Sequence, residues 1–190
     1  MNGTPLLATS PVPDVIVGVD PVSIGIDPVL AGLGPVLDAN TRLIVLGSFP
    51  GVASLQAQQY YGHPRNQFWP ILGALWGVDL GASNYARRLD VARAHGLGLW
   101  DVYASCRRVG SLDRAIEATQ LNDLGALRVL APMLRAVVHN GAESARAMAH
   151  TRALGLPVQR LPSTSPANAS WSFERKLAAW RTAFEEHGMA

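Results

Sequence analysis

Two short stretches of this chain of 190 residues concentrate side chains that could do chemistry. The first, YYGHPRNQFW, places Tyr61, His63, Arg65 and Asn66 close together, directly before an apolar run. An aromatic ring for stacking, a cation for phosphate and an amide for a base edge are the groups with which proteins recognise nucleic-acid bases. A simpler interpretation stays open here, in which the tyrosines pack against the core and Asn66 caps a helix.

The second stretch, LPSTSPAN, follows an apolar run and contains three hydroxyl groups, those of Ser163, Thr164 and Ser165. Small neutral donors of this kind can lie against the phosphates of a nucleic acid. A plain turn before the last helix would have a similar composition. The stretch alone does not decide between these two interpretations.

The composition limits the class of protein. Hydrophobic residues make up 48% of the chain and charged residues 16%, which indicates a globular protein and excludes a disordered one. The formal net charge of +2 is compatible with a polyanionic partner but too small to indicate one. The single cysteine, Cys106, excludes an internal disulfide, and without a Cys/His cluster there is no iron–sulfur or structural zinc motif. We therefore expect a cytoplasmic protein with no metal and no cofactor.

The ends of the chain indicate one domain behind an irregular segment. The N-terminal residues lack the basic start and continuous apolar stretch of an export signal, and no run of about 18 apolar residues could span a membrane. Residues 1–38 carry many of the 13 prolines and no helical period, which predicts an irregular lead-in. We expect residues 39–190 to form a single domain, and the protein to be a monomer without a membrane partner.

The apolar pattern predicts strands and helices in alternation. Runs of β-branched residues and leucine followed by turn residues predict strands over 43–46, 97–106, 134–141 and 156–162. Apolar residues at helical spacing predict helices over 67–76 (between Asn66 as cap and Gly77 as stop), 83–96, 110–119 (capped by Ser111), 142–154 and 173–184. The tryptophans at apolar positions are assigned to the core: Trp69, Trp76, Trp100 and Trp180.

Strands that alternate with helices predict the fold class. Parallel neighbours need crossover connections, so the alternation favours an α/β protein: a three-layer α/β/α sandwich with a central four-stranded parallel sheet. In such sheets ligands bind at the carboxyl ends of the strands. The four segments that follow the strands, GSFPG, SCRRVGS, HNGAES and PSTSPAN, are therefore expected to converge on one edge.

The first of these segments, GSFPG, has a composition that lets the backbone turn sharply and approach a ligand. It contains Gly47 and Gly51, with Pro50 between them. A tight turn without a ligand explains it equally well. The segment does not match the GxGxxG, GxxxxGK[ST] or GxSxG patterns, so it offers no support for a dinucleotide-binding, P-loop or esterase function.

Five motifs taken in order resemble a known family. LGSFPG, YYGHPRNQFW, LWDVYASCRRVGSLD, HNG and LPSTSPAN resemble the hypoxanthine-DNA glycosylase branch of the uracil-DNA glycosylase superfamily, over residues 33–184. The resemblance implies base excision repair, in which the enzyme hydrolyses the N-glycosidic bond of hypoxanthine, uracil or both in DNA and leaves an abasic site. Double-stranded DNA is the implied partner, with single-stranded DNA also open. None of these motifs contains a lysine, and the chain's only lysine, Lys176, belongs to the predicted last helix, which favours a monofunctional enzyme.

The resemblance also implies catalytic roles. The first family motif normally offers an Asp or Asn that positions the attacking water, but Phe49 stands in that place. The role is expected to move to Asn66, with His63 as the second candidate. The second family motif usually begins with His or Asn, whereas this chain has Leu161 there, so a polar group that could stabilise the leaving base is missing. Asp101, late in its strand, could orient a loop or a water molecule.

Further residues are expected to bind the flipped base and the DNA. Tyr61 would stack on the base, while Asn140 and backbone groups of the first loop would meet its polar edge; that loop is Gly47, Ser48, Phe49, Pro50 and Gly51. On this reading LPSTSPAN is a clamp on the DNA backbone, and the expected phosphate contacts are Ser163, Thr164, Ser165 and Arg65. Two further candidates for phosphate contact are Arg107 and Arg108.

Two other functions compete with this one. The same fold could hydrolyse free nucleosides or nucleotides instead of DNA. Alternatively the protein could bind damaged or single-stranded DNA without cleaving it, since Phe49 and Leu161 stand where polar groups would be expected.

Overall fold

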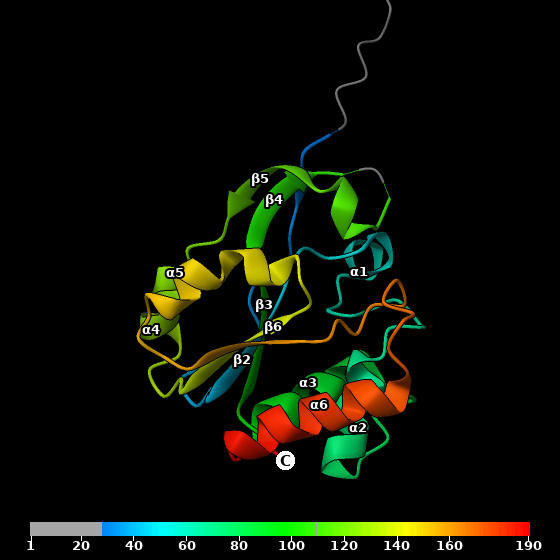
Figure 1. Cartoon of the computed structure of the whole chain (residues 1–190), viewed down its shortest axis with the longest axis vertical. Helices are drawn as coiled ribbons and strands as arrows, with labels where there is room; N and C mark the ends of the chain where they lie inside the picture. Colours follow the sequence, from blue (N-terminus) through cyan, green and yellow to red (C-terminus); the bar gives the residue numbers. More distant parts are fainter. Residues whose placement is uncertain (1–27, 109) are drawn as a thin grey trace, which may run out of the picture.

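A four-stranded parallel sheet forms the centre of the protein in a computed structural model, which describes residues 28–108 and 110–190 (Figure 1). The strand order is β3-β2-β6-β7, and every neighbouring pair is parallel. The strands are β2 (Leu43–Gly47), β3 (Leu97–Asp101), β6 (Ala136–Asn140) and β7 (Val158–Leu161). The predicted parallel sheet is confirmed.

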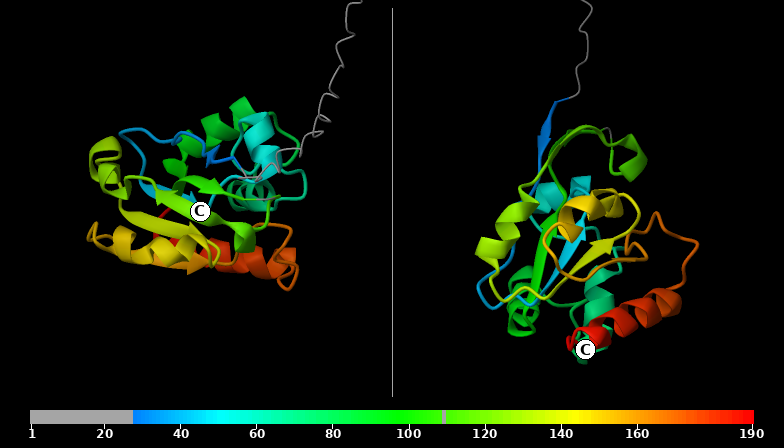
Figure 2. Two further views of the ribbon diagram at one scale, coloured as in Figure 1. Left: turned by 90° about the horizontal axis from the view of Figure 1, so that it is seen from above. Right: turned by 60° about the vertical axis from the view of Figure 1, so that its left-hand side comes forward.

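Helices cover both faces of this sheet (Figures 1 and 2). Side chains alternate along β2, so that Leu43 and Val45 join one hydrophobic cluster while Ile44 and Leu46 join the other. The first cluster packs under α2 (Phe68–Trp76), α3 (Tyr85–Ala94) and α6 (Phe173–Glu186). The second lies under two short helices, α4 (Leu127–Leu130) and α5 (Met148–Arg152). The predicted three-layer α/β/α sandwich is therefore confirmed.

The start and the buried face of helix α6 follow from its sequence. Ser172 caps it, because the serine side chain accepts a hydrogen bond from the Arg175 N–H (3.3 Å). The apolar stripe faces the core, where Trp180 and Phe184 are fully buried. Trp69 and Trp100 are also buried as predicted, whereas Trp76 is only partly buried at the edge of the core.

A second, antiparallel sheet was not predicted. It has the order β1-β4-β5 and consists of β1 (Leu30–Ala31), β4 (Tyr103–Arg107) and β5 (Glu117–Leu121). The predicted strand 97–106 therefore divides at Val102, whose N–H donates to the Gly47 carbonyl (2.9 Å). Residues before this point pair in the central sheet, and residues after it pair in the second sheet.

The predicted helix over 110–119 is wrong. This region contains a short 3₁₀ turn, η1 (Asp113–Ala115), followed by β5. Pairing with β4 satisfies the backbone of this segment, which outweighs its modest helical pattern. Ser111 caps a different element: its hydroxyl oxygen accepts a hydrogen bond from the Val52 N–H (2.9 Å), at the start of α1 (Val52–Ala57), a helix that was not predicted.

The described end of the expected lead-in, residues 28–38, pairs with both sheets. Strand β1 pairs with β4, and Val36 and Leu99 exchange two backbone hydrogen bonds of 2.8 and 2.7 Å. The rest of the expected lead-in, residues 1–27, lies outside the described residues. The predicted helix 142–154 is shorter than expected and consists of η3 (Ser144–Ala147) and α5. Among the described residues, no helix is both long and apolar enough to cross a membrane.

Candidate active site

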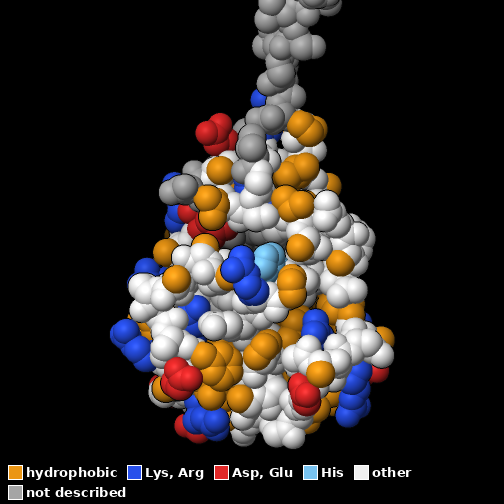
Figure 3. Space-filling model, turned by 90° about the vertical axis from the view of Figure 1, so that its right-hand side faces the viewer, with side chains coloured by type: hydrophobic (Ala, Val, Ile, Leu, Met, Phe, Trp, Pro, Cys, Tyr) orange, Lys and Arg blue, Asp and Glu red, His pale blue; other side chains and the backbone are white. Residues whose placement is uncertain are grey.

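A cavity of about 1200 Å³ opens at the carboxyl ends of the parallel strands. Figure 3 shows the side of the molecule that is hollowed there, with basic side chains and a histidine gathered beside the hollow. All of the predicted site residues line this cavity, namely Gly47, Ser48, Phe49, Pro50, Gly51, Tyr61, His63, Arg65, Asn66, Asn140, Ser163, Thr164 and Ser165. The loops after β2, β6 and β7 thus converge as expected, and the segment before α2 joins them. Of the described residues in the fourth expected segment, SCRRVGS, only Ser111 lines the cavity, because the segment begins within β4 of the second sheet.

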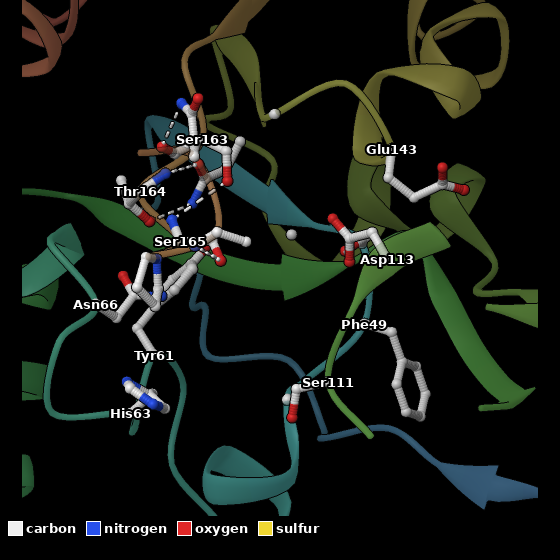
Figure 4. Close-up of a pocket in the computed structure, with 18 of the residues that line it drawn as sticks. Phe49, Tyr61, His63, Asn66, Ser111, Asp113, Glu143, Ser163, Thr164 and Ser165 are labelled. Carbon is white, nitrogen blue, oxygen red and sulfur yellow. Dashed lines mark hydrogen bonds between the residues drawn. The ribbon is translucent and has the colours of Figure 1, made fainter. Parts of the chain in front are cut away.

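The loop after β2 offers its backbone rather than its side chains. The Ser48 hydroxyl donates to Asp113 Oδ1 (2.7 Å). Phe49 is 6% exposed, and its ring belongs to the hydrophobic core, with the Arg108 guanidinium 5.1 Å from the ring centre. Arg108 is itself buried and donates to the Pro50 carbonyl, so it holds this loop instead of facing a phosphate as expected. Figure 4 shows Phe49 across the cavity from Tyr61 and Asn66.

Gly47 and Asp101 are the last residues of β2 and β3 and lie opposite each other in the sheet. A Cβ atom on Gly47 would collide with Asp101 Oδ1 and would lie 3.6 Å from the Tyr61 hydroxyl. The bare Cα of Gly47 therefore makes room for two polar groups at the inner end of the cavity. The buried atoms Asp101 Oδ2 and Tyr61 Oη have no hydrogen-bond partner among the described residues.

Burial raises the pKa of the Asp101 carboxyl to about 7. The negative charge of Asp113 adds to the increase, and the positive charge of Arg108 opposes it. The pKa of Asp113 is also raised by burial, although the hydrogen bond from Ser48 acts in the opposite direction. Near neutral pH, Asp101 is thus divided between its neutral and its ionised form.

The substitution Asp101→Asn should change how stability depends on pH. Between about pH 4 and pH 7 the folded protein keeps a proton on Asp101 that the unfolded chain releases, so this group's contribution to stability falls as pH rises through that range. As pH rises from about 4 to about 7, the free energy of unfolding of the variant should therefore increase relative to that of the wild type, by on the order of a few kcal/mol in total. Denaturant titrations of both proteins at about pH 4 and at about pH 7 measure the difference. If the stability of the two proteins changed equally between these pH values, the raised pKa of Asp101 would be contradicted.

Tyr61 is held in an unusual conformation. Its φ angle is 55°, in the left-handed region that non-glycine residues rarely adopt. One face of its ring stacks on Phe68, with ring centres 3.8 Å apart and an interplanar angle of 23°. The neighbouring Tyr60 hydroxyl donates to the Leu33 and Gly34 carbonyls (3.2 and 3.0 Å), so Tyr60 is a core residue.

The segment from His63 to Asn66 is a compact turn. The Asn66 N–H donates to the His63 carbonyl (2.8 Å), and the Arg65 N–H donates to His63 Nδ1 (3.1 Å), which places the ring proton of neutral His63 on Nε2. Asn66 Oδ1 accepts a hydrogen bond from the Phe68 N–H (3.0 Å), at the start of α2. Asn66 therefore both supports the helix start, as the simpler interpretation held, and lines the cavity.

Thr164 and Asn140 bind each other. The Thr164 N–H donates to Asn140 Oδ1 (3.0 Å), and Asn140 Nδ2 donates to the Thr164 hydroxyl oxygen (2.9 Å). The Thr164 carbonyl also accepts from the Gln67 N–H (3.0 Å). Thr164 is fully buried and Asn140 is 9% exposed. These two residues fasten LPSTSPAN to β6 and to the segment that carries Asn66.

The two serines beside Thr164 are arranged differently. The Ser163 and Ser165 hydroxyl oxygens accept hydrogen bonds from the Ser165 and Ala167 N–H groups (both 3.2 Å). Each O–H is left to donate to a ligand. The loop can approach β6 closely because Gly141 has no side chain: a Cβ there would lie 2.9 Å from the Cβ of Ser163. Figure 4 shows residues 163–165 grouped with Tyr61 and Asn66.

Several lining residues were missed or undervalued in the sequence. Arg160 lies in β7, and Trp171 follows LPSTSPAN with the Arg175 guanidinium 4.4 Å from its ring centre. Glu143 also lines the cavity and accepts a hydrogen bond from the Tyr103 hydroxyl (2.9 Å). Their only signal was proximity to the expected loops. The described part of the chain contains no group of three or more His, Cys, Asp or Glu residues that could hold a metal ion.

Comparisons with known proteins agree with this geometry. A sequence model described as the Uracil DNA glycosylase superfamily matches residues 35–186. A curated relative from Methanosarcina barkeri (strain Fusaro / DSM 804), named Hypoxanthine DNA glycosylase, is 39% identical over 149 residues, or 78% of this chain and 94% of the relative. One of the same name from Methanosarcina acetivorans is 36% identical over 148 residues, or 78% of this chain and 93% of the relative.

A solved structure has the same fold. It is a solution NMR structure from Methanosarcina acetivorans, described provisionally as a uracil DNA glycosylase, with a TM-score of 0.77 and 34% identity over 85% of this chain and 99% of that one. The layered fold, the cavity and these relatives define a DNA glycosylase. The chain belongs to the uracil DNA glycosylase superfamily, and the predicted resemblance to its hypoxanthine branch is confirmed.

Proposed function

We propose that this protein is a monofunctional glycosylase that hydrolyses the N-glycosidic bond of hypoxanthine, uracil or both in DNA and leaves an abasic site. The convergence of Tyr61, Asn66 and residues 163–165 on one cavity carries the proposal. The names of the two curated relatives support hypoxanthine as a substrate.

The reaction begins with base flipping. A base inside the duplex is out of reach, so the nucleotide must rotate into the cavity, at a cost of roughly a few kcal/mol that is lower for a mispaired, deaminated base. One face of the Tyr61 ring stacks on Phe68, so the opposite face can stack on the flipped base. Backbone groups of Ser48 and Phe49 would meet the polar edge, because the side chains of both residues are engaged elsewhere.

Asn66 would orient the attacking water. Its amide does not titrate, so it cannot act as a strong base, but it can hydrogen-bond a water molecule on the cavity side. This suits a reaction in which the bond to the base breaks early and water arrives late. Charge separates between sugar and base in the transition state, so fixed dipoles around the cavity contribute most. His63 is the second candidate, although its Nδ1 already accepts a hydrogen bond from the Arg65 N–H.

The lysine needed for Schiff-base strand cleavage does not reach the cavity. Lys176 is 2% exposed, and its Nζ donates to Gln67 Oε1 (2.8 Å), behind the cavity wall. The position of Lys176 therefore supports a reaction that ends at the abasic site.

The phosphate contacts are expected to come from Ser163, Ser165 and Arg65, while Thr164 anchors the loop. The double substitution Ser163→Ala and Ser165→Ala should weaken DNA affinity by about tenfold without changing its salt dependence, because neutral donors are lost. Arg65→Gln should reduce the slope of log affinity against log salt by about 1. Fluorescence anisotropy with a duplex that carries a 2′-fluoro damaged nucleotide, which blocks excision, measures both effects.

A control separates the hydroxyl group from the shape of the loop. Ser165→Thr keeps the O–H donor and should bind as the wild type does. If the double alanine variant bound as tightly as the wild type, the serine clamp would be disproved.

The decisive experiment uses duplexes that carry hypoxanthine, uracil or xanthine, with free deoxyinosine assayed beside them. We expect abasic sites in at least one of the first two duplexes and no cleavage of free deoxyinosine. Hydrolysis of the free nucleoside alone would indicate a nucleoside hydrolase. Tight binding to damaged DNA without base release would indicate a DNA-binding protein of the same fold.

A further inference from the structure

Asp101 is a buried polar residue of the cavity whose hydrogen bonding is incomplete. It ends β3, lines the cavity and is 4% exposed, yet its Oδ2 atom lacks a partner among the described residues. Asp113, in the same cavity wall, differs in that it accepts a hydrogen bond from Ser48. Leaving a buried polar group unpaired typically costs about 1–3 kcal/mol, and more for a charged one. A partner supplied by a ligand would recover that cost.

The Asp101 carboxyl is packed closely against Gly47 at the edge of the sheet, where Asp101 lines the cavity. Gly47 lies opposite it, and any side chain at that position would collide with Oδ1. The Tyr61 hydroxyl, also without a partner, lies near the same point. Tyr61 is the residue proposed to stack on the base, so the carboxyl lies where the edge of a stacked base would be found.

We propose that Asp101 is the specificity-determining residue that binds the lactam edge of the flipped base. This rests on the proposed function. Hypoxanthine carries an N–H beside a carbonyl oxygen, and uracil has the same pair. A neutral carboxyl group offers a carbonyl oxygen and an O–H at matching spacing, so the two can form paired hydrogen bonds. As the base leaves, negative charge collects on its carbonyl oxygen, and the O–H of Asp101 stabilises it.

The protonation state decides whether this pairing is complete. An ionised carboxylate has acceptors only, so it could bind the N–H of the base but would repel the carbonyl oxygen. Because burial raises the pKa of Asp101 to about 7, both forms are present near neutral pH. The ionisable groups that act on or with Asp101 are Asp113, Arg108, Tyr60, Tyr61 and Tyr85. The competing role, a carboxylate base that activates water, would need the ionised form instead.

The test compares single-turnover base release by the wild type, Asp101→Asn and Asp101→Leu between about pH 6 and 8.5, below the range in which the base itself ionises. The wild-type rate should fall by up to about tenfold per pH unit above the pKa of Asp101. An asparagine offers C=O and N–H₂ in place of C=O and O–H. The Asn variant should therefore release the base within about tenfold of the wild type at pH 6, lose the pH dependence and exceed the wild type at pH 8.5. The Leu variant should lose at least a factor of ~100 at every pH.

A matched control is Glu143→Gln, which alters another carboxyl group lining the same cavity and should keep the wild-type pH profile. Inactivity of Asp101→Asn with a wild-type rate that rises with pH would overturn the proposal in favour of a carboxylate base. Wild-type and Asn profiles of the same shape would also overturn it, while leaving the glycosylase function standing. If the wild type releases no base from any duplex, the proposed function fails and this inference fails with it.

Discussion

Replacing Asn66 with alanine should slow single-turnover base excision by a factor of at least ~100, the loss typical of one well-placed transition-state group. Asn66 lines the cavity, and its Oδ1 atom is fixed by the Phe68 N–H. The rigid turn around it sets the direction of the amide. Without that amide, water in the cavity would have to be ordered at the moment of reaction, which is the main expected cost. Base release from a hypoxanthine duplex with enzyme in excess measures the effect.

The same substitution removes the acceptor for the Phe68 N–H, so a control must separate this structural loss from the chemical one. Asn66→Ser keeps a hydroxyl oxygen that can accept that hydrogen bond but is too short to replace the amide. We expect the serine variant to unfold at nearly the wild-type temperature and to excise as slowly as the alanine variant. A serine variant with wild-type excision would show that Asn66 only supports the start of α2.

Replacing Asn140 with alanine should damage both the stability and the activity of the protein. Asn140 makes two hydrogen bonds to the buried Thr164, and the substitution would leave a buried N–H and hydroxyl without partners. We expect a loss of about 2–4 kcal/mol in the free energy of unfolding. Because LPSTSPAN would lose its attachment to β6, excision should fall by a factor of ~100 as well. Denaturant unfolding and the single-turnover assay measure the two effects.

Asn140→Asp is the informative companion. A carboxylate can accept hydrogen bonds from both the Thr164 N–H and the Thr164 O–H, so this variant should keep the loop in place. We expect it to recover most of the stability and part of the activity. If Asn140→Ala lowered activity with no loss of stability, Asn140 would contact the base directly, as first expected from the sequence.

The central sheet could be predicted because its strands are short apolar runs bounded by turn residues. The run around Leu43 is buried on both faces, which gives a continuous apolar pattern that no exposed element shares. The second sheet could not be predicted in this way. Strand β5 has the sequence EATQL, in which only the pairing with β4 favours an extended chain, and that pairing has an irregular register.

The place of the active site could be predicted for a similar reason, since parallel strands end at one edge. The detailed roles could not. Thr164 looks like a surface hydroxyl in the sequence, but the bare Cα of Gly141 lets its loop approach β6, where Thr164 is buried against Asn140. Likewise no residue pattern reveals that Gly47 approaches the Asp101 carboxyl closely or that Asp101 Oδ2 lacks a partner among the described residues.

The hydrogen bond between Lys176 and Gln67 has a practical consequence. Lys176 is the chain's only lysine, is almost fully buried and joins α6 to the residue after Asn66. An amine-reactive reagent would therefore modify this side chain only when α6 separates from α2. Mass spectrometry of the modified protein, with and without DNA, would then report at one position how often the wall behind the active site opens.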